Sequence, residues 1–355
     1  MDAETKEICK FYQGKRVLVT GHTGFKGSWL CEILKQWGAE VTGYALPPVE
    51  PSLFVLAKVQ EGMRSIEGDI RNFTQLEAVF DEVQPELVLH LAAQPIVRTS
   101  YEDPVYTYET NVMGTVHILE CVRRHPCVKS FVNVTTDKVY ENKEWEYGYR
   151  ELDRLDGYDP YSNSKSCSEL VTHSYKQSFF ADGSCAISTM RAGNVIGGGD
   201  FAKDRIVPDC IRAALKKEAV VLRNPHSIRP YQHVLEPLSV YLTVAAKQYM
   251  DRSFEGSYNV GPDDEDCVST GRLADFFCEF WGEGLHWENH YDGGPHEANF
   301  LKLDCSKLKK TFAWKPRYHV REAVQKTVEW AKAYERGEEM QAVTREQIAA
   351  FFEEK

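Results

Sequence analysis

Two short segments of this chain carry side chains whose types and spacing suit proton transfer. Tyr161 and Lys165 lie four residues apart, which places both on one face of a helix. A lysine ammonium beside a phenol stabilises the phenolate and lowers the pKa of the tyrosine, so Tyr161 is suited to remove the proton of an alcohol. Upstream, Thr136, Asp137 and Lys138 place a hydroxyl, a carboxyl and an amine side by side. Together the two segments predict oxidation of an alcohol coupled to an elimination.

A glycine-rich turn near the start of the chain has the spacing of a dinucleotide-binding turn. The pattern G-x-x-G-x-x-G separates a β-branched run at residues 16–20 from helix-like apolar spacing at residues 28–37. Glycines in such a turn allow the backbone to approach a pyrophosphate at the N-terminus of the following helix. The turn residues expected to contact the cofactor are Gly21, Thr23, Gly24, Phe25 and Gly27.

The sequence favours NAD over NADP without deciding between them by charge. Residues 41–45, at the end of the second predicted strand, contain no acid for the adenosine ribose and no arginine pair for a 2′-phosphate. Lys26 either faces a phosphate or points into solvent. Lys165 is expected to hold the nicotinamide ribose, which connects the glycine turn to the tyrosine and lysine pair.

Further cofactor contacts are expected where the third and fourth strands end. Asp69 and Ile70 follow the third strand, and Asp69 either reaches the adenine edge or caps a helix or turn. Leu91, Ala92 and Ala93 end the fourth strand, where small side chains either let the cofactor lie close to the sheet or serve close packing alone.

Strand candidates alternate with stretches long enough for helices. This alternation is typical of parallel strands joined by right-handed crossovers, so the predicted fold is α/β, with a Rossmann-type doubly wound parallel sheet. Thr136 to Lys138 then fall at the carboxyl edge of the sheet, where ligands bind, although a solvated turn is the alternative. The predicted strands are residues 16–20, 40–45, 64–67, 86–91, 130–135 and 186–191.

Residues 1–192 are expected to form the dinucleotide-binding domain. The glycine-rich stretch 193–200 ends the strand pattern, and residues 193–355 are expected to form mostly a smaller, mixed α/β substrate-binding lobe that is discontinuous in sequence. Some of these later segments are expected to return to the first domain. Helices are predicted near residues 208–216, 237–249, 270–281 and 320–336, with a helical tail after residue 337.

Composition narrows the classes of function. The net charge of −11 over 355 residues argues against a nucleic-acid partner and requires a local basic pocket for any anionic substrate. Ten scattered cysteines form no C-x-x-C pair and no zinc-site spacing, so no metal site is expected. The N-terminus lacks an apolar signal core and no apolar run reaches membrane-spanning length. These features predict a cytoplasmic protein that does not associate with a membrane.

Seven segments in order along the chain resemble the CDP-glucose 4,6-dehydratase family of extended short-chain dehydrogenases/reductases. The glycine turn and the T-D-K run are more specific to this family than the superfamily motifs are. Related dTDP-glucose dehydratases carry a glutamate where this chain has Lys138. The segments are GHTGFKGSWL (21–30), LAAQP (91–95), TTDKVYEN (135–142), YDPYSNSK (158–165), RAGNVIGGGD (191–200), SIRPYQHVLEP (227–237) and LKLDCSK (301–307).

The resemblance implies a reaction in three steps with bound NAD. Tyr161 would take the proton of the sugar 4-hydroxyl while hydride leaves C4. Water would then leave across C5 and C6, with Asp137 as the acid. Lys138 would stand in the position of the base, and it either removes the C5 proton, stabilises the enolate or orients a water. Return of hydride to C6 would give CDP-4-dehydro-6-deoxy-D-glucose and regenerate NAD.

The same resemblance implies a set of residues that bind CDP-glucose. Arg229 and His233 would contact the diphosphate, Asn194 the sugar or diphosphate, and His296 the nucleotide ribose. It also implies a homodimer or dimer of dimers that pairs through the helix before the fifth strand and the helix of Tyr161. The full set of substrate residues is Gln94, Asn194, Arg205, Arg229, His233 and His296.

Three other functions remain open. A sugar-nucleotide epimerase shares the glycine turn, Tyr161 and Lys165 but needs no acid beside Thr136. A dehydratase for another nucleotide sugar differs only in the base that it recognises, and here cytosine is implied by the resemblance alone. An NAD-sensing regulator without catalysis is disfavoured because such proteins usually lose the tyrosine or the lysine.

Overall fold

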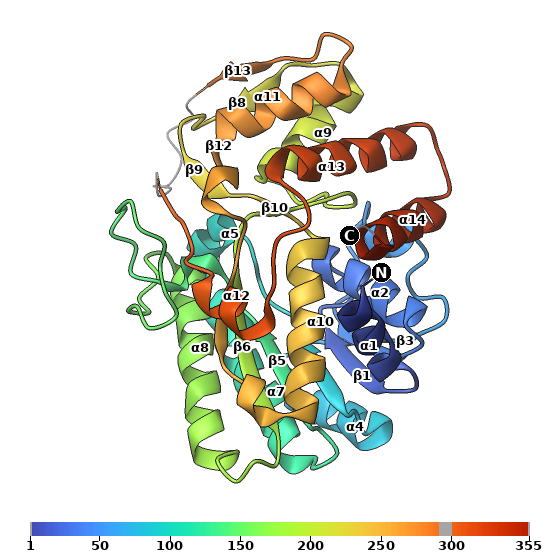
Figure 1. Ribbon diagram of the computed structural model, residues 1–355, viewed down its shortest axis with the longest axis vertical. Coiled ribbons are helices and arrows are strands. Elements are labelled where there is room, and N and C mark those ends of the chain that lie inside the picture. The colour runs from blue at the N-terminus through green and yellow to red at the C-terminus, as the bar shows by residue number, and fades with distance from the viewer. Residues whose placement is uncertain (1, 291–299, 354–355) are drawn as a thin grey trace.

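A computed structural model describes residues 2–290 and 300–353, and its central element is a seven-stranded parallel sheet with helices on both faces (Figure 1). The strand order is β11-β6-β5-β4-β1-β2-β3. The chain runs outward from β1 in both directions, so the order reverses between β1 and β4 and opens a crevice at their carboxyl ends. The strands are β1 (Arg16–Thr20), β2 (Glu40–Ala45), β3 (Arg64–Glu67), β4 (Leu87–His90), β5 (Ser130–Val134), β6 (Ala186–Ala192) and β11 (Ser257–Val260).

The apolar runs of the inner strands follow from burial on both faces of the sheet. Every residue of β4, β5 and β6 is buried, because helices cover both sides. Successive residues of β1 enter opposite layers: Val17 and Val19 pack in one cluster and Leu18 in the other.

One layer is formed by α1 (Ala3–Tyr12), α2 (Phe25–Gln36) and α10 (Leu235–Met250), and the other by α4 (Phe73–Val83), α7 (Gly114–Arg124) and α8 (Pro160–Phe179). Two elements from the later part of the chain join this region. Strand β11 pairs with β6 at the edge of the sheet, and α10 packs against β5 and β6. The shorter elements nearby are α3 (Leu53–Leu56), α5 (Val97–Glu102), α6 (Pro104–Tyr108), the π-helix η1 (Glu109–Met113), the 3-10 turns η2 (Asp137–Val139) and η3 (Arg252–Phe254), and α12 (Ser306–Phe312).

A smaller lobe with its own apolar core lies above the sheet in Figure 1. Its helices are α9 (Ile206–Lys216), α11 (Thr270–Trp281) and α13 (Val320–Glu335), and α14 (Met340–Glu353) continues from it to α2. Three two-stranded sheets complete it: β7 (Val195–Ile196) with β10 (Gln232–His233), β8 (Val220–Leu222) with β13 (Trp287–Asn289), and β9 (Ile228–Pro230) with β12 (Cys267–Ser269), which follows η4 (Asp264–Asp266).

The predicted fold class is confirmed. The predicted strands 16–20, 40–45 and 64–67 coincide with β1, β2 and β3, and the predicted helix 270–281 coincides with α11. Within the described ranges, none of the helices has the length and apolar character needed to cross a bilayer.

Candidate active site

A cleft of about 1280 Å³ lies between the carboxyl edge of the sheet and the smaller lobe. The ends of β5 and β6 contribute one wall, and loops after β7 and β9 contribute another. This position matches the crevice that a doubly wound sheet opens where its strand order reverses. The chain therefore brings its predicted chemistry to one place.

The glycine turn forms the floor of the cofactor half of the cleft. Gly21 has φ +75°, and a Cβ there would lie 2.7 Å from the backbone nitrogen of Ala92. A Cβ on Gly27 would lie 2.2 Å from the carbonyl oxygen of Gly21. Gly24 caps α2 without a side chain, so the first turn of this helix presents its N–H groups directly. Thr23 and Phe25 also line the cleft, and the turn fits a pyrophosphate.

The other predicted cofactor contacts line the same half of the cleft: Asp69, Ile70, Leu91, Ala92 and Ala93. The Asp69 carboxylate accepts a hydrogen bond from the backbone N–H of Arg71 and pairs with its guanidinium at 2.7 Å, and this pairing lowers the pKa of Asp69. Helix α4 is capped by Asn72 instead, so Asp69 caps a turn and still faces the cleft. The shape and the donors of this half are those that a dinucleotide requires.

The T-D-K run lies at the end of β5, facing the cleft. Asp137 is buried, and its carboxylate accepts hydrogen bonds from the Thr136 hydroxyl at 2.9 Å and the Asn194 amide at 3.5 Å. Lys138 is half-buried and lines the same wall. A Cβ on Gly193 would lie 1.8 Å from a carboxylate oxygen of Asp137, so only glycine leaves room for this acid. The run is therefore a built part of the cleft wall.

Helix α8 presents Tyr161 and Lys165 to the cleft from its first turns. Asp159 caps the helix by accepting from the N–H of Ser162. The Lys165 ammonium donates to the carbonyl of Val134 at 3.1 Å, and burial lowers its pKa to about 8 while Glu169 opposes the shift. Tyr161 and Lys165 thus lie beside the end of β5.

The sequence predicts that Lys165 lowers the pKa of Tyr161, but in the structure this pKa is raised. Burial raises the pKa of Tyr161 to about 12. The groups that oppose this rise are the Thr136 hydroxyl, which hydrogen-bonds the phenol, and the positive charge of Arg205. Lys165 is not among these groups, and its own pKa of about 8 means that its amine is already neutral where Tyr161 titrates. In this structure desolvation outweighs the neighbouring charges.

Three of the expected substrate residues lie in the cleft: Asn194, Arg205 and Arg229. Asn194 has a left-handed φ of 41°. Arg205 forms an ion pair with Asp200 at 3.0 Å, and Arg229 is buried. The cleft thus has basic groups on the side of the smaller lobe, which an anionic substrate requires in a chain of net charge −11.

The structure places two other expected substrate residues elsewhere. Gln94 is buried beside the cleft wall, where its amide donates to Thr107 and accepts from the N–H of Ile96. His233 is fully buried in the core with its ring against Trp29 and Tyr318, and burial lowers its pKa to about 3. Neither side chain lines the cleft, because both are packed inside the fold. His296 lies outside the described residues.

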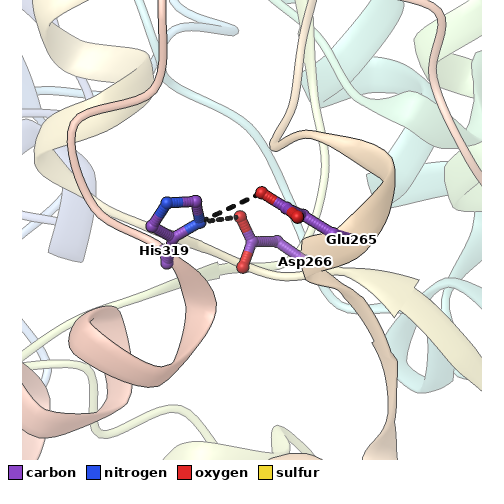
Figure 2. Close-up of side chains that lie close together, drawn as sticks. All are labelled: Glu265, Asp266 and His319. Atoms are coloured by element: carbon purple, nitrogen blue, oxygen red, sulfur yellow. Dashed lines mark hydrogen bonds and ion pairs between the residues drawn. The ribbon is translucent and has the colours of Figure 1, made fainter.

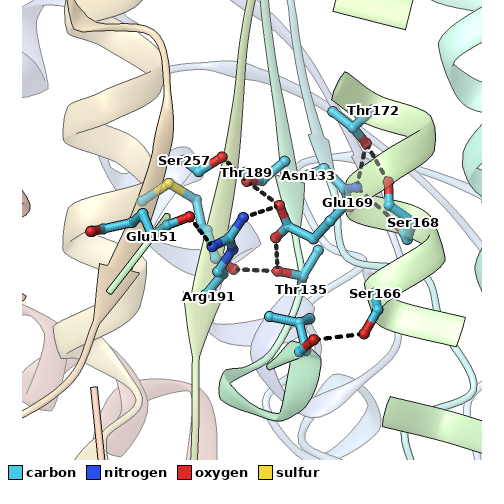
Figure 3. Close-up of polar contacts among 12 residues, drawn as sticks. Asn133, Thr135, Glu151, Ser166, Ser168, Glu169, Thr172, Thr189, Arg191 and Ser257 are labelled. Carbon is cyan, nitrogen blue, oxygen red and sulfur yellow. Dashed lines mark hydrogen bonds and ion pairs between the residues drawn. The ribbon is translucent and has the colours of Figure 1, made fainter. Parts of the chain in front are cut away.

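A buried ion pair behind the cleft joins α8 to the sheet, and no local sequence pattern had signalled it (Figure 3). Glu169, one turn after Lys165, accepts from Arg191 at 2.9 Å, from Thr189 at 2.7 Å and from Thr135 at 2.5 Å. These partners lie on β6 and just after β5. The network holds the helix that carries Tyr161 and Lys165 in register with the T-D-K run.

One cluster of possible metal ligands lies outside the cleft (Figure 2). Asp266 accepts from the N–H of Val320 and from the ring of His319, both at 2.9 Å, and Glu265 lies alongside. Hydrogen bonding to Asp266 raises the pKa of His319. These bonds satisfy the first turn of α13, so helix capping accounts for the cluster.

The sequence and the fold are similar to those of known proteins. The chain is 49% identical over 348 residues to the CDP-glucose 4,6-dehydratase of Salmonella typhimurium, covering 96% of this chain and 97% of the relative. The fold is similar to a UDP-glucose 4-epimerase of Thermus thermophilus solved with NAD (27% identity, TM-score 0.77, 89% of this chain and 99% of that one). It is also similar to a dTDP-glucose 4,6-dehydratase of Bacillus anthracis solved with NAD (22% identity, TM-score 0.77, 92% and 100%).

The profile of the GDP-mannose 4,6 dehydratase family matches residues 18–264, a span that includes the glycine turn, the T-D-K run, Tyr161 and Lys165. With the near full-length similarity to a CDP-glucose 4,6-dehydratase, this match shows that the chain belongs to the NAD-dependent nucleotide-sugar 4,6-dehydratase family.

Proposed function

We propose that this protein converts CDP-D-glucose to CDP-4-dehydro-6-deoxy-D-glucose and water, with NAD used and regenerated in each cycle. The observation that carries the proposal is that one cleft holds the dinucleotide cradle, the tyrosine and lysine pair, and an acid and an amine beyond Thr136. An epimerase needs the first two features only. Residues 1–192 supply most of the cofactor half, and the later part of the chain supplies most of the substrate half.

Tyr161 acts as the base for the first step. It takes the proton of the C4 hydroxyl, and the Thr136 hydroxyl and the charge of Arg205 favour its phenolate against burial. NAD, when bound, supplies the acceptor for the C4 hydride and later the donor to C6. Lys165, held by the Val134 carbonyl at 3.1 Å, is placed beside Tyr161 to bind the nicotinamide ribose.

Asp137 and Lys138 act in the elimination. The ketone at C4 makes the C5 proton acidic. Lys138 either removes that proton or, if it stays charged, stabilises the enolate while a water that it orients takes the proton. Asp137 donates a proton to the C6 hydroxyl, which leaves as water. Burial of Asp137 between Thr136 and Asn194 fixes the direction of its carboxyl group in the cleft.

Arg229 and Arg205 are placed to hold the substrate diphosphate from the smaller lobe. A guanidinium binds two phosphate oxygens at once, and a buried guanidinium does so with little competition from water. Arg229 is 7% exposed and lines the cleft. Asn194 completes this side by contact with the sugar.

The protein acts as a homodimer or dimer of dimers in the cytoplasm. Apolar side chains exposed on α8 and on η1, which leads into α7, support pairing through this face: Leu170 is 55% exposed, Phe179 48% and Met113 47%. All ten cysteines are free thiols, as a reducing compartment favours. Light scattering after size exclusion tests the assembly, and Leu170→Glu is expected to shift it toward the monomer.

Incubation with CDP-, dTDP-, UDP- and GDP-glucose tests the reaction and the base together. We expect a 4-keto-6-deoxy sugar from CDP-glucose in preference to the other three. A preference for another base would mean that a different nucleotide-glucose is the substrate, and the proposed reaction would be unchanged. Inversion at C4 without loss of water would identify an epimerase and refute the dehydratase.

A further inference from the structure

Lys26 is a cation in the cleft that the mechanism above does not use. It is the second residue of α2 and follows Gly24, which caps this helix without a side chain. Its side chain is half-buried and lines the cleft. The alternative that it simply points into bulk solvent does not hold in the structure.

The charged groups around Lys26 come from four other segments of the chain. Lys165 on α8 and Arg205 before α9 are positive, and Asp137 on η2 and Asp200 after β7 are negative. Both carboxylates make their bonds to other groups. Asp200 pairs with Arg205 at 3.0 Å, and Asp137 accepts from the Thr136 hydroxyl at 2.9 Å.

Within residues 2–290 and 300–353, Lys26 forms no ion pair of its own. Burial, with the positive charges of Arg205 and Lys165, lowers the pKa of Lys26 to about 8. A half-buried ammonium beside two other cations is unfavourable unless an anion joins them. The backbone of Lys26 belongs to the first turn of α2, whose N–H groups also favour an anion.

We propose that the Lys26 ammonium binds a phosphate oxygen of the NAD diphosphate as that group lies on the first turn of α2. Lys26 then contributes an ion pair to cofactor affinity that the glycine backbone alone does not supply. The inference requires only that the cleft binds NAD, and it does not depend on which nucleotide sugar reacts. The diphosphate of the nucleotide sugar is the other anion of the same chemistry that reaches this cleft.

Equilibrium dialysis of the purified protein separates the two diphosphates. The ligands are NAD, ADP-ribose, which keeps the diphosphate without the nicotinamide, and CDP. The variants are Lys26→Met and Lys26→Gln, which remove the charge, and Lys26→Arg, which keeps it. Lys203→Met is the matched control, because Lys203 is an exposed lysine at the rim of the same cleft.

Both neutral variants are expected to bind NAD and ADP-ribose roughly 10- to 100-fold more weakly, the effect of losing one charge-assisted hydrogen bond. Binding of CDP should stay within about twofold, Lys26→Arg should restore the affinity for NAD, and Lys203→Met should match the wild type. Thermal unfolding without ligand shows whether each variant is folded. Two neutral variants are used so that the test still stands if one of them does not fold.

The pH dependence provides a second readout. A diphosphate binds the protonated lysine, and the pKa of Lys26 is about 8, so the penalty of Lys26→Met should be largest near pH 7 and shrink as the pH rises. Lys165 titrates in the same range and is present in both proteins, so the difference between them reports mainly on Lys26. Weaker binding of CDP with unchanged NAD would assign Lys26 to the nucleotide sugar and overturn the proposal. Unchanged affinity for all three ligands would also overturn it.

Discussion

Replacement of Asp137 by asparagine together with Lys138 by alanine is expected to separate oxidation from elimination. An asparagine side chain has nearly the shape of aspartate, so residue 137 keeps its place while the acid is lost: its oxygen can accept from the Asn194 amide, and its NH2 group can donate to the Thr136 hydroxyl. Neither group of the first step is replaced: Lys165 is held by the Val134 carbonyl, and loss of the Asp137 charge removes one influence that raises the pKa of Tyr161.

The size of the effect follows from the number of proton transfers removed. One positioned acid or base contributes about 10²- to 10⁴-fold to a rate, or about 3 to 5 kcal/mol in the barrier. Elimination should slow by at least this factor, while formation of reduced nicotinamide should stay near the native rate. The protein would stall at CDP-4-keto-glucose.

Single-turnover mixing with CDP-glucose provides the assay. The absorbance of reduced nicotinamide should rise and persist, and incorporation of solvent deuterium at C5 should fall sharply. The matched control is Asp264→Asn with Lys302→Ala, an acid and amine pair 3.7 Å apart outside the cleft, which should behave as wild type. Native-rate formation of the 4-keto-6-deoxy sugar by the double variant would show that Asp137 and Lys138 take no part in the elimination and would refute the mechanism.

Four other outcomes are expected. Tyr161→Phe should slow the first reduction of the nicotinamide by roughly 10²- to 10⁴-fold, and a near-native single-turnover rate would remove Tyr161 as the base. Arg229→Ala should weaken substrate binding by about 2 to 5 kcal/mol with NAD binding nearly unchanged, and an equal loss for NAD would place Arg229 in the other half of the cleft. Glu169→Gln should lower the free energy of unfolding in denaturant by about 3 to 5 kcal/mol, since Arg191 loses its buried partner, and a loss below about 1 kcal/mol would contradict this role. Burial raises the pKa of Glu236 to about 7, above its value in the unfolded chain, so the stability that Glu236 contributes is present below about pH 4.5 and is lost as the pH rises toward 7. The free energy of unfolding of Glu236→Gln should therefore fall less than that of the wild type over this range. Parallel pH curves for the two proteins would exclude the effect.

Local patterns were enough to predict six of the seven strands of the sheet, with β11 as the exception. Strand β1 is an inner strand, buried except at its first residue, and therefore reads as an apolar run that marks its range. The edge strand β3 is mostly exposed, yet β2 and β3 also coincide with their predicted ranges. The glycine turn and the spacing of Tyr161 and Lys165 depend on contacts within a few residues, so they too are visible in the chain. The carboxyl ends of parallel strands meet at one edge, which places Thr136 to Lys138 in the same cleft.

Contacts between distant segments decided the rest. Arg229 and His233 are four residues apart, yet Arg229 on β9 lines the cleft and His233 on β10 lies in the core, because the two strands pair with different partners. The direction of the pKa shift of Tyr161 depends on burial by the whole fold, which outweighs its neighbours. The pairing of Glu169 with Arg191 joins a helix to a strand across 22 residues, and no local sequence pattern at either residue predicts it. Side-chain type and spacing thus specify what chemistry a segment can do, whereas packing decides which side chains reach the cleft and in which charge state.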